Sequence, residues 1–236
     1  MKSTAPFICR QFSVQHARSA FKVGTDSILL GSWVNAIEPK KILDIGTGSG
    51  ILSLMMAQRF HADITAVEID PSSAKEAQQN FQHSKWSNRL HLIEGDINII
   101  SSSLKKEVDL VISNPPFFNR AITNTQQRST VARHDDRLNF RQLVSVVSRV
   151  LVQDGTFALI LPVSEMLQLI DLSSLFFLKP QRICMVKSFE NTDPIRMMVQ
   201  FGYKSGEVLQ KEEIFLYSKP GVRSTAYHKL TEDFYV

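Results

Sequence analysis

The chain has 236 residues, of which 43% are hydrophobic and 21% charged; this composition is typical of a globular protein and excludes a disordered one. No apolar run reaches the ~18 residues that a membrane helix needs, and the start lacks the apolar stretch of a secretory signal, so we expect a cytoplasmic protein. The formal net charge of +4 permits a polyanionic partner without requiring one. The two cysteines, Cys9 and Cys184, cannot form a disulfide framework, and we expect buried thiols.

Neither repeats nor a long linker interrupts the chain, so the sequence predicts one domain over residues 1–236, with residues 1–39 as an N-terminal extension. Within that extension, residues 25–36 start with a threonine cap and carry an apolar stripe. This pattern predicts a helix lying over the carboxyl end of the first strand.

From residue 40 onward, short β-branched runs alternate with longer amphipathic ones, which is typical of parallel βαβ units. The predicted strands are 41–45, 63–68, 90–93, 108–113 and 155–161, and the predicted helices are 50–60, 72–83, 140–151 and 163–175. Three further strands, 182–187, 197–203 and 213–217, follow without helices between them, which favours antiparallel pairing. We therefore predict a Rossmann-like α/β fold whose mostly parallel, seven-stranded sheet ends in an antiparallel hairpin.

A glycine-rich turn follows the first predicted strand of the sheet. Gly46, Gly48 and Gly50 permit backbone to approach a ligand closely, and Glu68 ends the next strand, 24 positions after Asp44. A carboxylate at this distance is typical of a ribose-binding site. The turn lacks the Gly-x-Gly-x-x-Gly spacing of nicotinamide enzymes, and Asp44 suits a cationic ligand better than a pyrophosphate. These features favour S-adenosylmethionine.

Asp96 follows the third predicted strand and is placed to accept a hydrogen bond from the adenine amino group of such a cofactor. A helix cap or a turn explains an aspartate at this position equally well.

The fourth predicted strand ends abruptly in Asn114, Pro115, Pro116 and Phe117. Two successive prolines fix a rigid extended turn whose carbonyl groups are left unpaired. If the Asn114 side-chain oxygen and the Pro115 carbonyl accept both N–H bonds of an amine, its lone pair is aimed at the cofactor methyl, and no strong base is needed. Phe117 is suited to stack on a planar base or amide.

A run of arginines follows this turn, and such a basic rim favours RNA modestly. Its members are Arg120, Arg128, Arg133, Arg137 and Arg141, and Arg10, Arg18 and Lys22 extend it from the N-terminal side. The alternative for each is a solvated surface charge. Neighbouring residues 134–136 (HDD) cannot readily converge on one ion, so we expect no metal.

The segments 44–50 (DIGTGSG), 67–70 (VEID) and 114–117 (NPPF) resemble the motifs of class I S-adenosylmethionine-dependent methyltransferases that modify amino or amide nitrogens. Segments 21–27 with 29–31, 132–134 and 230–236 are, more narrowly, similar to the tRNA1(Val) (adenine(37)-N6)-methyltransferase family, and the resemblance spans nearly the whole chain. It implies N6-methylation of adenine 37, beside the anticodon of the tRNA. We expect the protein to be a monomer. Phe117 stands where many relatives have tyrosine.

The resemblance also implies site residues: residues 114–117 at the target base, and, on the cofactor, Thr25, Asp26, Asp44, Gly46, Gly48, Gly50, Glu68 and Asp96. The four-residue motif is shared by guanine-N2 and glutamine-N5 methyltransferases, which stay as alternatives. A nicotinamide oxidoreductase and a non-catalytic RNA-binding module are alternatives of other classes.

Overall fold

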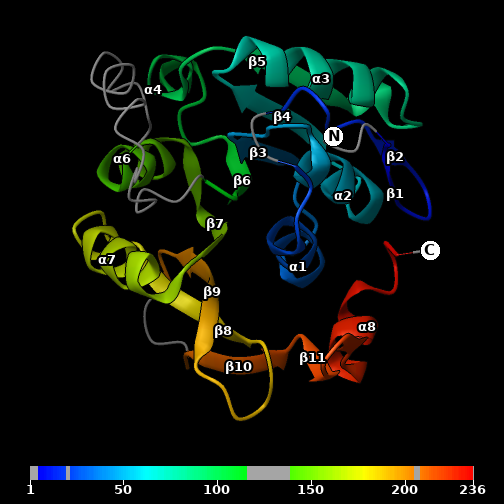
Figure 1. The fold of residues 1–236 in the computed structure, drawn as a ribbon. Helices are drawn as coiled ribbons and strands as arrows, with labels where there is room; N and C mark the ends of the chain where they lie inside the picture. The colour runs from blue at the N-terminus through cyan, green and yellow to red at the C-terminus, as the bar shows by residue number, and fades with distance from the viewer. Residues whose placement is uncertain (1–4, 20–21, 116–138, 205–207, 236) are drawn as a thin grey trace, which may run out of the picture.

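A computed structural model describes residues 5–19, 22–115, 139–204 and 208–235 of the chain. Its centre is an eight-stranded sheet in the order β10-β8-β9-β7-β6-β3-β4-β5 (Figure 1). The strands are β3 (Lys41–Ile45), β4 (Asp63–Glu68), β5 (Leu90–Glu94), β6 (Val108–Ser113), β7 (Leu151–Leu161), β8 (Lys179–Lys187), β9 (Pro194–Gly202) and β10 (Gln210–Phe215). The run from β7 to β5 is parallel, whereas β9 is antiparallel to both β7 and β8.

Helices cover both faces of this sheet, as Figure 1 shows. On one side lie α1 (Thr25–Trp33), α2 (Ile51–Arg59) and α3 (Pro71–Gln82), and on the other α4 (Ile97–Ile100), α6 (Phe140–Val150) and α7 (Val163–Ser174). Short 3-10 turns span Ser87–Arg89 and Ser101–Ser103. Because side chains alternate along a strand, Ile42 faces the first layer and Leu43 the second. Two hydrophobic cores thus hold the sheet in place.

The sequence predicted the parallel half of the sheet well. β3, β4 and β6 have the predicted bounds, and the α/β class and the antiparallel β8–β9 hairpin are confirmed. The strand count was wrong, because β10 is an eighth strand of the central sheet. The predicted antiparallel pairing of this last strand was wrong too. Because β9 lies between β7 and β8, the chain returns to the outer edge of β8, where β10 pairs with β8 in parallel.

The N-terminal helix is shorter than predicted and is capped differently. α1 ends at Trp33, because Val34 has a non-helical ψ of 137° and the Asn35 N–H bonds instead to the Gln200 side chain. The N-cap residue is Gly24, without a side-chain hydrogen bond, so Thr25 is the first helical residue and not the cap.

Several short elements near the chain ends were not predicted from the sequence, because the strands among them have only two or three residues and the helix has only seven, too few for a clear periodicity. They are β1 (Phe7–Ile8), β2 (Ser13–Val14), β11 (Tyr217–Lys219), β12 (Val222–Arg223) and α8 (Thr225–Thr231). α8 packs on α1 and β10. The Arg10 N–H donates to the Phe234 carbonyl at 2.9 Å, which joins the two ends of the chain.

A polar latch on α3 fixes the N-terminal strap, residues 15–19, which leads toward α1. The buried Glu76 carboxylate accepts hydrogen bonds from the backbone N–H groups of Arg18 (3.0 Å) and Ser19 (2.8 Å) and from the Ser19 hydroxyl (2.5 Å). Asn80 exchanges hydrogen bonds with the Gln15 backbone and also donates to the Ser49 carbonyl in the glycine turn. One helix thereby ties the strap to the glycine turn.

Candidate functional site

The strand order reverses between β3 and β6, so their carboxyl ends open a crevice of the kind in which doubly wound folds bind ligands. The Ser113 hydroxyl donates to the Ile45 carbonyl at 2.8 Å and holds the two strand ends together. Asp44, Glu68, Asp96 and Asn114 lie at or just after the carboxyl ends of strands at this edge, whereas Asp26 lies in the first turn of α1. The structure therefore places most of the residues predicted for the cofactor and the residue predicted for the target base, Asn114, at the same edge of the sheet.

The glycine turn leaves room for a ligand at two of its three glycines. Gly46 and Gly48 have φ of 70° and 58°, and none of the described residues has an atom within 4 Å of the place where a Cβ would stand. Gly50 differs: a Cβ there would approach the Phe81 ring to 2.5 Å. Gly50 is therefore required for packing of the turn against α3, whereas Gly46 and Gly48 open the space above it.

Glu68 is 9% exposed and binds the turn from the end of β4. Its Oε2 accepts from the Gly48 N–H at 2.8 Å, and its Oε1 accepts from the Asp70 N–H at 2.9 Å. Each carboxylate oxygen has a second lone pair. The side chain is thus fixed in orientation and retains acceptor capacity for a pair of hydroxyl groups.

Asp44 is fully buried at the end of β3 and is only partly satisfied. Its Oδ2 accepts from the Thr47 hydroxyl (2.6 Å) and from the Ser53 hydroxyl (2.7 Å) and N–H (3.1 Å). Its Oδ1 is buried without a hydrogen-bond partner among the described residues. Burial raises the pKa of Asp44 to about 6, although the hydrogen bonds from Thr47 and Ser53 act in the opposite direction. An unpaired buried carboxylate oxygen favours a cationic ligand beside it, which fits the ammonium or sulfonium of S-adenosylmethionine.

Asp96 is the N-cap of α4, as the alternative explanation of this residue expects. Its Oδ1 accepts from the Asn98 N–H at 2.8 Å and from the Asn98 side chain at 2.9 Å. Both hydrogen bonds reach one oxygen, so Oδ2 is left as an acceptor at the edge of the sheet. The cap and a cofactor contact are therefore compatible.

Asn114 follows β6, and its amide is held by α1. The Asn114 Nδ2 donates to the Ser27 Oγ at 2.9 Å, across 87 positions of sequence. This hydrogen bond fixes the amide plane, and none of the described residues donates to Oδ1, which is left as an acceptor. Pro115 is buried beside it. Pro116 and Phe117 lie outside the described residues.

α1 is a rigid support for Ser27. The Arg59 guanidinium donates to the Gly31 carbonyl at 2.6 Å, and Arg182 donates to the Trp33 carbonyl at 2.9 Å. At the helix start, the Asp26 carboxylate pairs with Arg196 Nε at 2.8 Å, so Asp26 is already engaged by a cation. Thr25, the first residue of the helix, is partly exposed.

Neither Ser27 nor Arg196 was predicted from the sequence to be a site residue. Ser27 lies within the segment that carried the family resemblance, but nothing in a sequence indicates a side-chain contact with a residue 87 positions away. Arg196 lies near the start of the antiparallel strand β9 (Pro194–Gly202), and only the position of β9 beside β7 brings it to α1.

The predicted RNA-binding residues are only partly covered by the structure. Lys22 is exposed just before α1, and Arg10, Arg18 and Arg141 are exposed as well. Arg120, Arg128, Arg133 and Arg137 fall in the range 116–138, outside the described residues. Within the described ranges, no group of three His, Cys, Asp or Glu side chains is placed to hold a metal. Nor does any described helix have the length and apolarity needed to cross a bilayer.

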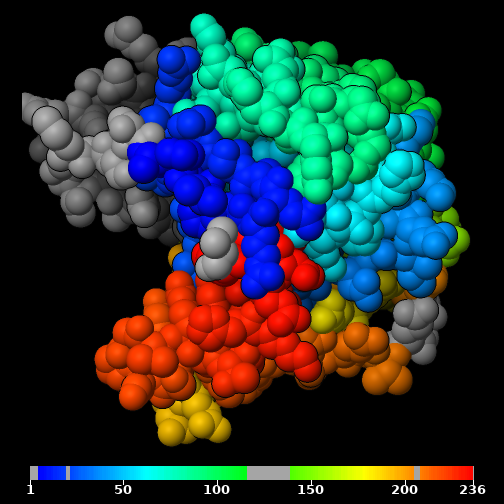
Figure 2. Space-filling view, turned by 90° about the vertical axis from the view of Figure 1, so that its right-hand side faces the viewer, coloured from blue at the N-terminus to red at the C-terminus, as the bar shows by residue number. Residues whose placement is uncertain are grey.

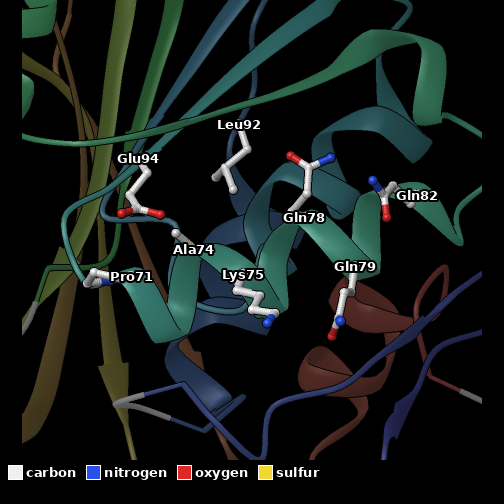
Figure 3. A pocket seen from close by; sticks show the side chains of 8 residues that line it. All are labelled: Pro71, Ala74, Lys75, Gln78, Gln79, Gln82, Leu92 and Glu94. Carbon is white, nitrogen blue, oxygen red and sulfur yellow. The ribbon is translucent and has the colours of Figure 1, made fainter.

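An open groove of about 620 Å³ lies elsewhere, along α3 and the edge strand β5 (Figure 3). Pro71 and Glu94 lie together at one end of it, and Gln79 and Gln82 at the other. Its remaining lining residues are Ala74, Lys75, Gln78 and Leu92. None of them belongs to β6 or α1, so the groove is distinct from the crevice at Asn114.

Comparisons with known proteins agree with this geometry. Residues 15–161 match the model of the methyltransferase small domain family. The solved structure of a predicted O-methyltransferase from Agrobacterium tumefaciens superimposes with a TM-score of 0.69 over 89% of this chain and 96% of that one, at 19% identity. Fold and site together define a class I methyltransferase.

Two full-length relatives narrow this class. The tRNA1(Val) (adenine(37)-N6)-methyltransferase of Bacteroides fragilis is 36% identical over 98% of this chain and 97% of its own. The protein of the same name from Photobacterium profundum is also 36% identical, over 98% of each chain. The chain belongs to the methyltransferase small domain family and, within it, to the family of these tRNA1(Val) (adenine(37)-N6)-methyltransferases.

Proposed function

We propose that this protein transfers a methyl group from S-adenosylmethionine to the exocyclic N6 of an adenine in tRNA, namely adenine 37 of tRNA1(Val). The observation that carries the proposal is the amide of Asn114, which Ser27 holds with its oxygen free at the switch-point crevice. The relatives that share nearly the full chain length supply the target, because their names specify that nucleotide.

The cofactor supplies a methyl carbon made electrophilic by its sulfonium. We assign the ribose hydroxyls to Glu68, the adenine amino group to Oδ2 of Asp96, and the cationic methionine portion to Oδ1 of Asp44. Gly46 and Gly48 leave open space for the ligand between these groups. The orphaned, buried Asp44 oxygen supports this assignment most directly.

Thr25 and Asp26, at the start of α1, were both predicted to bind the cofactor, and we now assign them different roles. Asp26 is held by Arg196 at 2.8 Å, and we assign it the task of fixing the helix start. Thr25 is partly exposed, and we assign to it the contact with the cofactor. Ser27 acts on the site through Asn114 and is a positioning residue.

Asn114 and Pro115 act on the target amine. An exocyclic amine of adenine is a weak nucleophile because its lone pair is delocalised into the ring. When the Asn114 oxygen and the Pro115 carbonyl each accept one of its N–H bonds, the lone pair is turned toward the methyl carbon, and fixed dipoles stabilise the charge that develops on nitrogen. Pro116 would keep this turn rigid and Phe117 would stack on the base; both roles stay predictions.

Binding of the RNA requires cations around the crevice. For this we propose Lys22 together with Arg120, Arg128, Arg133 and Arg137, which would neutralise phosphates of the anticodon loop. We propose further that the protein acts as a monomer in the cytoplasm.

The proposal is tested by nucleoside mass spectrometry of tRNA1(Val) from a strain that lacks this protein. We expect N6-methyladenosine to be missing at position 37, and to return when the wild-type gene is supplied but not when the Asn114→Ala variant is. Loss of N2-methylguanine instead, or loss of N5-methylglutamine from a protein, would overturn the assignment of adenine as the target.

A further inference from the structure

We propose that the C-terminal platform, residues 214–231, is a second RNA contact remote from the target base, in which Arg223 binds a phosphate of the nucleic acid. This inference rests on the proposed function and adds a place where the tRNA is held. The platform comprises the end of β10, the β11–β12 hairpin and α8.

The charge of the platform is of one sign. Residues 214–231 contain Lys219, Arg223 and Lys229 and no aspartate or glutamate. Lys219 and Lys229 are exposed. The acids that precede the platform, Glu212 and Glu213, are paired with Arg182 and Lys187. The acids Glu232 and Asp233 follow it and are exposed. The cations of the platform itself are thus not paired within it, as binding of a polyanion requires.

Arg223 is held by aromatic rings and not by an acid. Its Cζ lies 4.5 Å from the centroid of the Tyr217 ring and 4.2 Å from that of Tyr227. Its Nη1 is buried and has no hydrogen-bond partner among the described residues. A guanidinium fixed in this way keeps its full charge and a defined orientation, which is what binding of a phosphate by an arginine requires.

The platform faces the same edge of the molecule as the crevice. β8 and β10 run parallel to each other, and β8 runs in the direction of β7 because both are antiparallel to β9. The chain therefore leaves β10 and enters the β11–β12 hairpin at the edge where Asn114 follows β6. Figure 2 shows this orange-to-red segment standing out at the lower left, with the molecular surface hollowed above it.

The platform is also rigidly connected to the site. The Ser224 hydroxyl caps α8 by accepting from the Tyr227 N–H at 3.0 Å, and the hydroxyls of Tyr227 and Tyr235 are 2.9 Å apart. α8 packs on α1, the helix that carries Ser27. A phosphate bound at Arg223 would therefore be held at a fixed position relative to Asn114. The proposed target site acts on a single base, and a second contact of this kind would select a whole tRNA.

The test compares binding of a full-length tRNA1(Val) transcript by the wild-type chain and by Arg223→Gln, Lys219→Gln and Lys229→Gln, measured by fluorescence anisotropy at several salt concentrations. Lys40→Gln is the matched control, because Lys40 is exposed just before β3 and lies at the opposite edge of the sheet. We expect Arg223→Gln to weaken binding about tenfold and to lower the slope of log K against log salt by about 0.7–0.9, the change expected when one phosphate contact is lost. The control should leave both quantities unchanged.

Two further measurements separate the possible outcomes. The cofactor dissociation constant of each variant should equal that of the wild type, because the platform contains none of the residues assigned to the cofactor. If Arg223→Gln fails to fold, the two lysine variants decide, since neither side chain is packed against a ring. If the wild type methylates tRNA but the variants have the same salt slope as the wild type, the RNA contact at the platform is overturned and the proposed function stands. If the wild type does not methylate tRNA, the proposed function itself is refuted.

Discussion

The side-chain amide of Asn114 donates a 2.9 Å hydrogen bond to Ser27 Oγ, and this contact decides which end of the amide is free. An amide whose nitrogen is engaged presents its oxygen, the end that accepts from an amine. The orientation of Asn114 is thus supplied by a helix of the N-terminal extension, 87 positions earlier in the chain.

Replacement of Ser27 by alanine should therefore reduce turnover without reducing cofactor affinity. Loss of one neutral hydrogen bond costs about 1 kcal/mol, which corresponds to roughly five- to tenfold in kcat. Ser27→Thr keeps a hydroxyl and should recover part of the activity. A fall in cofactor affinity in Ser27→Ala, measured by calorimetry, would show that the residue supports the cofactor site instead.

Asn114→Ala should abolish methyl transfer while cofactor affinity stays within about twofold of the wild type. The substitution removes the acceptor that turns the amine lone pair, a loss on the order of 10²–10³ in kcat for a preorganised group of this kind. Single-turnover assays with saturating tRNA measure the effect. A variant that keeps more than a tenth of the wild-type rate would show that the amide is not part of the chemistry.

Glu68→Ala should have the opposite profile. Its carboxylate fixes the glycine turn through the Gly48 N–H at 2.8 Å and is the proposed ribose acceptor, so the loss of charged hydrogen bonds worth about 1.5–3 kcal/mol should weaken cofactor binding by roughly 10- to 150-fold. At saturating cofactor, kcat should recover to near the wild-type value. Equal cofactor affinities of Glu68→Ala and Asn114→Ala would contradict the division of roles.

Cofactor affinity should fall as the pH drops below about 6. Burial raises the pKa of Asp44 to about 6, and a positively charged ligand binds better to the ionised carboxylate, so protonation weakens binding by up to about tenfold per pH unit below that pKa. Asp44→Asn is the matched control: its oxygen can still accept from Thr47 and Ser53, while its NH₂ replaces the unpaired oxygen. We expect this variant to bind weakly and without pH dependence between pH 5 and 7 in calorimetric titrations.

Glu76→Gln should destabilise the fold and loosen the N-terminal strap. The carboxylate accepts from Arg18 and Ser19, and these hydrogen bonds outweigh burial and hold the pKa of Glu76 below its usual value. A lowered pKa in the folded state gives stability that is present above the ordinary pKa near 4.5 and is lost as pH falls through the folded value. We expect denaturant unfolding at pH 7 to show a loss of about 2 kcal/mol. The exposed Glu190→Gln serves as control, and equal unfolding free energies would contradict the latch.

The parallel half of the fold was predictable because each of its elements carries its own pattern. β3, β4 and β6 are short, largely apolar and β-branched segments, and the turn residues after β3 and β6 mark where the strands end. The switch point between β3 and β6 then follows from chain connectivity, and it brings Asp44 and Asn114 to one crevice.

The other half of the fold depends on tertiary pairing. The parallel partner of β10 is decided by where the hairpin β8–β9 inserts, which no local pattern encodes. The same holds for Ser27 and Arg196, whose contacts with Asn114 and Asp26 join distant segments. Gly50 shows a further limit: the sequence correctly marked a glycine turn, but packing against Phe81 accounts for this glycine.

The most direct test of the central claim is transfer of a labelled methyl group from S-adenosylmethionine to two tRNA1(Val) transcripts by the purified full-length protein. One transcript has adenine at position 37 and the other has guanine there. We predict that the first is labelled as N6-methyladenosine at position 37 by the wild type and not by Asn114→Ala, and that the second is not labelled. Equal labelling of both transcripts, or undiminished labelling by the Asn114→Ala variant, would contradict the proposed role of this site.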